Sequence, residues 1–131
     1  MTYAVLICHG QLAQELASTA QGIVGPQEAL FAFSNSRVDA AVLKGHVQEL
    51  LDRLAPDRPV LLVDLWGGSC WRIGMQICHQ NPGVELVSGV NLPMLVTFLS
   101  YRSKMGYAEL VEKLIQDGRK SIRTSGLAAG K

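Results

Sequence analysis

The sequence predicts a single α/β domain built on a doubly wound, mostly parallel sheet with helices on both faces. Two observations carry this prediction. Uninterrupted apolar runs of strand length, YAVLIC at residues 3–8 and VLLVDL at 60–65 with one acid near its end, indicate strands that are buried on both sides. Segments with apolar residues at helical spacing separate such runs, and strands that alternate with helices form parallel sheets.

Length, composition and charge limit the kinds of protein that this chain can be. The chain has 131 residues, 48% of them hydrophobic and 18% charged, so we expect one globular domain over residues 1–131. Its net charge of +1 gives no electrostatic case for nucleic acid or an anionic membrane as main partner. No signal peptide or membrane span is evident, and three cysteines without scaffold spacing suit a reducing compartment. We therefore expect a cytoplasmic protein.

Two strands and two helices are predicted in the first half of the chain. After the turn at His9-Gly10, a helix over 12–23 ends at Gly25-Pro26, and a short strand follows over 29–33. Ser36 and Asp39 have the spacing of a capping box at the start of the second helix, which ends at Ala55-Pro56. Their expected core stripes are Leu12, Leu16, Ala20 and Ile23 in the first helix, and Leu43, Val47, Leu50 and Leu54 in the second.

The second half repeats the alternation. The strand at 60–65 leads through Gly67-Gly68-Ser69 into a helix over 70–80, and a fourth strand follows over 84–90. Pro93 suits the first turn of the next helix. A last helix is predicted over Tyr107–Gln116. Residues 117–131 are polar with a weak alternation around Ser121–Thr124, which we interpret as a short edge strand and a frayed tail.

The candidate chemistry lies where two neighbouring strands end. In a doubly wound sheet the first and third strands are adjacent where the chain order reverses, so His9 and Asp64 are expected side by side. A carboxylate there fixes the tautomer of an imidazole and stabilises positive charge that develops on it. His9 is therefore a candidate nucleophile or general base whose second nitrogen points into the crevice.

The loop Gly67-Gly68-Ser69 adds the elements of an anion site. Glycines let the backbone come close, a helix N-terminus offers free N–H groups, and Ser69 adds a hydroxyl. Arg72, one turn into the helix, is a further source of positive charge. Each feature alone has an ordinary explanation as a turn, a cap or an incidental histidine. Their convergence on one crevice favours a phosphoryl-binding site.

Cys70 gives an alternative. It lies at a helix N-terminus, which lowers a thiol pKa, and Cys70, His9 and Asp64 have the residue types of a thiol-hydrolase triad. A small buried side chain at a helix start is the simpler interpretation. Neither Cys8-His9 nor Cys78-His79 has zinc-ligand spacing, so we expect no metal site.

Taken together, the segments CHG at 8–10, VDLWGGS at 63–69 and GVNLPML at 89–95 resemble a known family. The chain is similar to the IIA domains of the mannose/fructose-class permeases of the bacterial phosphoenolpyruvate:sugar phosphotransferase system (PTS). The resemblance implies a phosphoryl carrier that needs no cofactor. His9 would accept a phosphoryl group from the phosphocarrier protein HPr and pass it to a IIB domain, while Asp64 orients the ring and Ser69 contacts the phosphoryl group.

The resemblance also implies a homodimer with a C-terminal antiparallel strand at its interface. Two departures affect partner identity: Ser69-Cys70-Trp71-Arg72 replaces the usual run after the glycines, and Ser34–Arg37 replaces a Pro-Gly-Glu turn. Trp71, Leu92 and Met94 are candidates for a partner surface, with burial as the simpler interpretation for the last two. A phosphorylation-dependent regulatory module without a transport role remains an alternative to sugar uptake.

Overall fold

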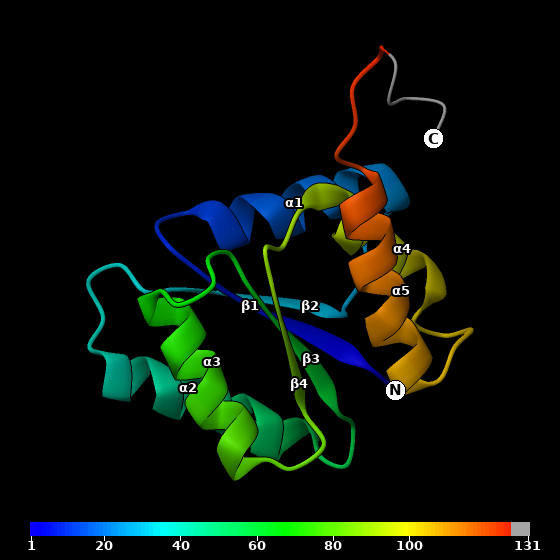
Figure 1. Ribbon diagram of the computed structural model, residues 1–131. Helices are drawn as coiled ribbons and strands as arrows, with labels where there is room; N and C mark the ends of the chain where they lie inside the picture. The colour runs from blue at the N-terminus through cyan, green and yellow to red at the C-terminus, as the bar shows by residue number, and fades with distance from the viewer. Residues whose placement is uncertain (127–131) are drawn as a thin grey trace.

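A computed structural model of the chain describes residues 1–126 as a three-layer α/β fold, with helices on both faces of one sheet (Figure 1). All four strands of the described residues run parallel, in the order β2-β1-β3-β4, which confirms the predicted fold class. No helix within residues 1–126 has both the length and the apolar character needed to cross a membrane. The elements are β1 (Tyr3–Cys8), α1 (Leu12–Val24), β2 (Leu30–Ser34), α2 (Ala40–Leu54), β3 (Pro59–Val63), α3 (Ser69–Gln80), β4 (Glu85–Ser88), α4 (Leu92–Tyr101) and α5 (Tyr107–Lys120).

The core has two halves, one on each face of the sheet. Alternate residues of β1 point to opposite sides: Leu6 packs under α1, α4 and α5, whereas Val5 and Ile7 pack under α2 and α3. All six residues of β1 and all five of β3 are buried. Burying a large aliphatic side chain contributes about 1.5–3 kcal/mol. The central strands are thus a rigid support for the loops that leave their carboxyl ends.

The strand order places two of those loops together. β1 lies between β2 and β3, so the chain turns one way from β1 to β2 and crosses to the other side for β3. Ile7 of β1 pairs with Val63 of β3, so His9 and Asp64 leave the sheet close to the same point. This is the reversal point at which open α/β sheets bind ligands.

Two details of the helix predictions were wrong. In the predicted stripe of α1, Ala20 is buried and Leu16 packs against the core, but Leu12 is 42% and Ile23 is 59% exposed. Ala13 and Ala17 take their places on the buried side. Alanines bring a helix axis closer to its neighbours than leucines would, and α1 packs against both β2 and α4. α2 begins after Asp39, whose carboxylate accepts the Ala41 N–H at 3.0 Å, so Asp39 rather than Ser36 is the cap.

The predicted C-terminal edge strand is absent from the described residues. α5 continues to Lys120, four residues past the predicted end at Gln116, and residues 121–126 form a turn and irregular chain. Contacts hold the extra turn: Asp117 accepts from the Thr97 hydroxyl at 2.8 Å, and Gly118 accepts at its carbonyl from Asn91 at 3.3 Å. Ser121–Thr124 pairs with no strand of the described residues, and residues 127–131 of the predicted tail lie outside them.

Candidate functional site

His9 and Asp64 form a hydrogen-bonded pair at the carboxyl edge of the sheet. Nδ1 of the His9 ring lies 2.9 Å from Oδ2 and 3.1 Å from Oδ1 of Asp64. The His9 backbone N–H also donates to Oδ2, at 2.9 Å. The carboxylate therefore holds both the backbone and the ring of His9, and the neighbouring strands bring the two residues together as the sequence predicted.

The pair is asymmetric in its exposure to solvent. The Asp64 side chain is 13% exposed, whereas that of His9 is 44% exposed. Burial alone raises the pKa of the Asp64 carboxyl, but the hydrogen bonds from the His9 backbone and ring, with the ring's charge, outweigh it and leave that pKa below its usual value. Asp64 is thus ionised at neutral pH and only accepts hydrogen bonds. The proton of a neutral His9 ring consequently lies on Nδ1, which leaves Nε2 with a free lone pair.

The loop after Asp64 approaches the other side of the ring. Gly67 has a φ of +80°, a conformation that favours glycine, and a Cβ on Gly68 would lie 3.4 Å from His9 Cε1. Gly68 precedes α3, and the Oγ of Ser69 in its first turn lies 3.3 Å from His9 Nε2. The first backbone N–H groups of a helix lack intrahelical acceptors, so this edge offers donors to an anion.

The sequence analysis missed a fourth polar residue, Asn35. Its side-chain nitrogen donates to Ser69 Oγ at 3.2 Å, and its backbone N–H donates to the Cys8 carbonyl at 3.2 Å. Asn35 directly follows β2, just as His9 follows β1 and Asp64 follows β3. The rule that located the other two residues therefore also points to this position.

Cys70 lies beside the pair without the properties of a nucleophile. Its thiol is fully buried, and burial together with the nearby charge of Asp64 raises its pKa to about 11. A thiol protonated at neutral pH argues against the hydrolase alternative. The side-chain atoms of His9, Asp64 and Cys70 that could bind a metal ion lie within 4.8 Å of one another. Nδ1 of His9 and the Asp64 carboxylate are, however, already joined by a direct hydrogen bond.

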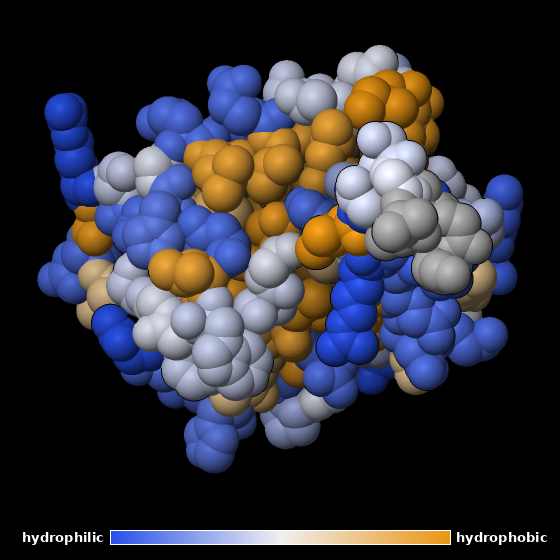
Figure 2. Space-filling view, turned by 45° about the horizontal axis from the view of Figure 1, so that its top comes forward, coloured by the Kyte–Doolittle hydropathy of each residue, from blue (hydrophilic) through white to orange (hydrophobic). Residues whose placement is uncertain are grey.

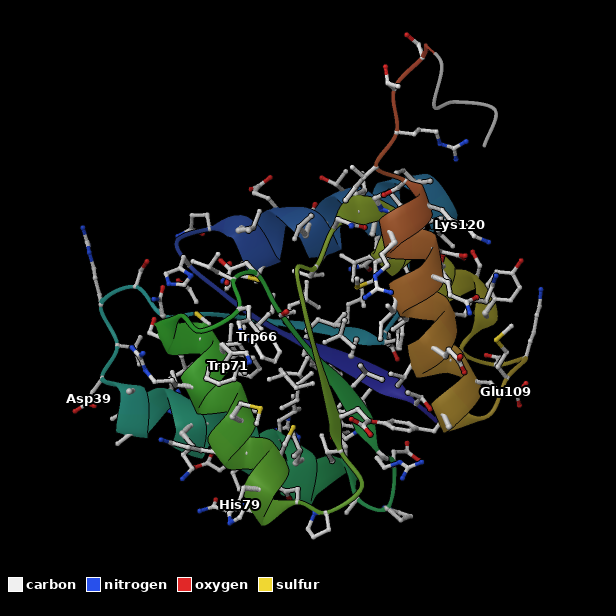
Figure 3. The ribbon with its side chains drawn as sticks, viewed as in Figure 1. Asp39, Trp66, Trp71, His79, Glu109 and Lys120 are labelled. Carbon is white, nitrogen blue, oxygen red and sulfur yellow. The ribbon has the colours of Figure 1, made fainter. Side chains whose placement is uncertain are left out.

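Of the predicted partner-surface residues, Trp71 and Leu92 are half-buried and Met94 is buried. Trp66 is 72% exposed and packs against the half-buried Trp71, with ring centroids 5.0 Å apart (Figure 3). Met94 is buried and Leu92 half-buried, so the simpler interpretation holds for Met94. Arg72 donates to the Gly67 carbonyl at 3.4 Å, which places its guanidinium against the glycine loop.

Comparisons with known proteins agree with this fold. The family model described as "PTS system fructose IIA component" (EIIA-man) matches residues 3–115. The chain is 32% identical over 129 residues to the PTS system mannose-specific EIIAB component of Escherichia coli (strain K12), an alignment that covers 94% of this chain. It spans only 39% of the length of that relative.

Two solved structures share the fold. The phosphotransferase system component EIIA from Streptococcus agalactiae has a TM-score of 0.87 at 20% identity, covering 95% of this chain and 97% of that one. The mannose/sorbose-specific IIA subunit from Enterococcus faecalis has a TM-score of 0.79 at 23% identity, covering 96% of each chain. With the family match over residues 3–115, these findings confirm the resemblance seen in the sequence: the chain belongs to the PTS fructose IIA component family.

Proposed function

We propose that the chain is a phosphoryl carrier in which His9 accepts a phosphoryl group from HPr and passes it to a IIB domain during sugar uptake. One observation carries the proposal: Asp64 holds Nδ1 of His9, while Nε2 faces Ser69 on the partly exposed side of the ring. We place this exchange in the cytoplasm, because all three cysteines are free, as suits a reducing compartment.

The transfer step follows from the charge distribution around the ring. The Nε2 lone pair attacks the phosphorus of a phosphohistidine on the donor protein. A new N–P bond forms as the donor N–P bond breaks, and the donor ring nitrogen recovers that electron pair. His9 keeps its Nδ1 proton and becomes positively charged, and the Asp64 carboxylate at 2.9 Å stabilises this charge as it develops.

The phosphoryl oxygens need donors that already point to the place where they arrive. The Ser69 hydroxyl and the free N–H groups at the start of α3 supply them, and Gly67 and Gly68 let the loop lie close to the ring. The step as written uses no metal ion and no cofactor.

Phosphorylation with purified components tests the proposal. Incubation with phosphoenolpyruvate, enzyme I and HPr should give an acid-labile, alkali-stable adduct that is absent in His9→Ala, much reduced in Asp64→Ala and retained in Cys70→Ala. Absence of an adduct in the wild type would overturn the proposal, and its loss only in Cys70→Ala would favour the thiol alternative. Adding a purified IIB protein of the mannose or fructose class then separates two roles: onward transfer supports the carrier, and retained label supports the regulatory alternative.

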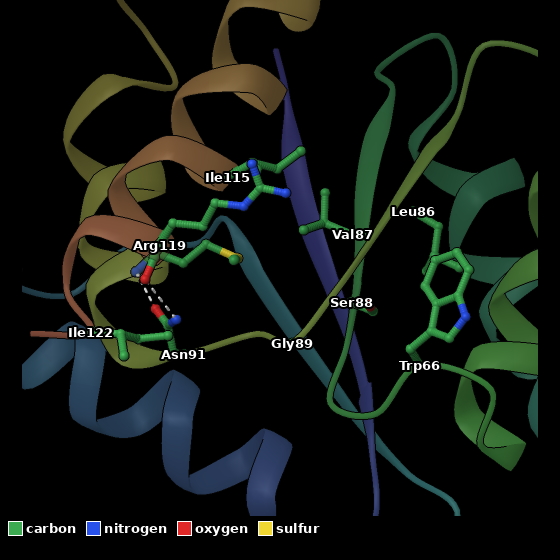
Figure 4. A pocket seen from close by; sticks show the side chains of 11 residues that line it. Trp66, Leu86, Val87, Ser88, Gly89, Asn91, Ile115, Arg119 and Ile122 are labelled. Carbon is green, nitrogen blue, oxygen red and sulfur yellow. Dashed lines mark hydrogen bonds between the residues drawn. The ribbon is translucent and has the colours of Figure 1, made fainter.

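We further propose that the chain forms a homodimer through the free edge of β4, with Ser121–Thr124 of one copy pairing antiparallel to β4 of the other. β4 is an edge strand in the described residues, and an unpaired edge is a template for strand addition. A groove of about 410 Å³ lies along it, with Trp66 and Leu86 on one side and Ile115, Arg119 and Ile122 on the other (Figure 4). Figure 2 shows apolar side chains gathered in a band across the middle of its face.

The oligomeric state tests the dimer. Sedimentation velocity should show a dimer that dissociates in Ile122→Asp, because Ile122 is 80% exposed in the single chain and lines the groove. Ile23→Asp is the matched control, since Ile23 is also exposed but lies on α1. A monomeric wild type, or equal dissociation of both variants, would contradict this arrangement.

A further inference from the structure

Asn35 connects a third strand end to the reacting histidine. Its backbone N–H bonds to the Cys8 carbonyl, which fixes the residue beside the end of β1. Its half-buried side chain reaches the N-terminus of α3 and donates from Nδ2 to Ser69 Oγ at 3.2 Å. Ser69 Oγ in turn lies 3.3 Å from His9 Nε2. Two hydrogen bonds, with Ser69 between them, therefore connect the Asn35 side chain to the nitrogen that would carry the phosphoryl group.

The types of donor and acceptor fix the direction of these hydrogen bonds. An amide nitrogen only donates, so Asn35 occupies a lone pair of Ser69 Oγ and the hydroxyl hydrogen must point elsewhere. At the other end of the series the ionised Asp64 only accepts, so the ring hydrogen of His9 lies on Nδ1. Nε2 is then an acceptor, and the Ser69 hydroxyl donates to it. Asn35 thus donates to Ser69, and Ser69 donates to His9 Nε2. On the other side of the ring, His9 Nδ1 donates to Asp64.

We propose that Asn35 is a positioning residue that directs the Ser69 hydroxyl hydrogen toward His9 Nε2, and toward the phosphoryl oxygens once that nitrogen is occupied. This inference deepens the proposed function and rests on it for the second half of the statement. The hydroxyl is held in the direction in which it must donate in the phosphorylated state, so little reorientation is needed during transfer. Asn35 thereby acts through Ser69 and need not touch the phosphoryl group.

A purely structural role for the Asn35 side chain is less consistent with its contacts. The loop after β2 is already fastened by the Asn35 backbone bond to Cys8 and by the Ser36 N–H, which donates to Ser34 Oγ at 3.0 Å. The only side-chain hydrogen bond of Asn35 among the described residues goes to Ser69. The amide is therefore not needed to close the loop, and its removal should change the site more than the fold.

Three variants and one control separate these roles. Asn35→Asp replaces a donor by an acceptor of the same shape, so the Ser69 hydroxyl should turn toward residue 35 and leave Nε2 without a donor. Asn35→Ala removes the contact without adding charge, and Ser69→Ala removes the intermediary. Ser36→Ala is the matched control, because Ser36 is an exposed neighbour in the same turn whose hydroxyl has no recorded partner in the described residues.

The first readout needs no phosphorylation. In ¹⁵N-labelled protein, at a pH where His9 is neutral, the Nε2 resonance should move in Asn35→Asp toward that of an unprotonated nitrogen without a hydrogen-bond donor. It should move in the same direction in Ser69→Ala, and stay unchanged in Ser36→Ala. An unchanged resonance in Asn35→Asp overturns the inference. It would mean that the wild-type Asn35 side chain already presents its oxygen, an acceptor, to Ser69, as the Asp carboxylate does. Thermal unfolding checks that each variant is folded. If Asn35→Asp is not folded, the effect of Asn35→Ala on the phosphorylation rate, given below, tests the inference.

The second readout is the rate of phosphorylation from HPr. Asn35→Ala should lower kcat by about fivefold, as expected for one hydrogen bond, with little change in KM for phosphorylated HPr. In a Ser69→Ala background the same substitution should have no further effect. Equal effects in both backgrounds would overturn the inference while the proposed function stands. If the wild type is not phosphorylated but the Nε2 resonance responds as expected, the proposed function fails and the directing role of Asn35 in the unmodified protein remains.

Discussion

Replacing Asp64 by Asn should slow phosphorylation of His9 by roughly 10- to 100-fold while leaving the shape of the site intact. Two unit charges 2.9 Å apart interact by about 6 kcal/mol at an effective dielectric constant of 20. Because the His9 side chain is 44% exposed, water screens much of this energy, and the range for charge-assisted hydrogen bonds, about 1.5–3 kcal/mol, is the better guide. An Asn side chain can also donate a hydrogen bond to Nδ1. The ring hydrogen of His9 can then lie on Nε2, and that nitrogen loses the lone pair that attacks the phosphorus.

The assay is single-turnover transfer from phosphorylated HPr, with the acid-labile adduct measured against time. Asp57→Asn is the matched control, because Asp57 pairs with the N-terminal ammonium group before β3, at the opposite edge of the sheet from His9. We expect its rate to equal that of the wild type. A rate for Asp64→Asn within about threefold of the wild type would refute the reasoning, since it would leave less than 1 kcal/mol for the carboxylate.

Three further predictions concern the loop, the thiol and pH. Gly67→Ala should destabilise the fold by about 1–2 kcal/mol because φ is +80°, whereas Gly45→Ala in open space on α2 should not; thermal unfolding of both variants checks this. Cys70, with a pKa of about 11, should react with iodoacetamide at pH 8 far more slowly in the folded than in the unfolded protein; equal rates would contradict its burial. Folding lowers the pKa of Asp64, so its stabilising effect is complete above about pH 5 and is lost as pH falls below about 4. Urea unfolding of the wild type and Asp64→Asn should therefore differ most near neutral pH and converge in acid, and a gap that widened in acid would contradict this.

The strands and the His9–Asp64 contact were predictable because buried parallel strands have a distinctive composition and a limited set of orders. Uninterrupted apolar runs located β1 and β3, and the usual reversal of chain order made them neighbours. The chemistry at their ends then followed from which polar residue came next. Phosphorylation of His9 itself stays a prediction.

The errors arose where local pattern gave less information than packing. Helical spacing located α1 and placed Leu16 and Ala20 correctly, but the fully buried residues of this helix are alanines. The larger Leu12 and Ile23 were therefore wrongly included in the stripe. The end of α5 depends on contacts of Asp117 and Gly118 with α4 and the residue before it, which no local signal reveals. Asn35 was missed because a turn asparagine is common, and only the folded sheet places its amide on Ser69.

The parallel sheet separates the molecule into two ends that tolerate change differently. His9, Asn35 and Asp64 lie in loops that leave the carboxyl ends of strands, and Ser69 begins the helix that follows one of these loops. The turns that enter the strands carry none of the four residues. A fluorescent label or a fused domain attached in those entering turns, such as the one around Pro82 between α3 and β4, would leave the reacting ring untouched. The fold thus provides a natural attachment point for sensors that report on the other end of the protein.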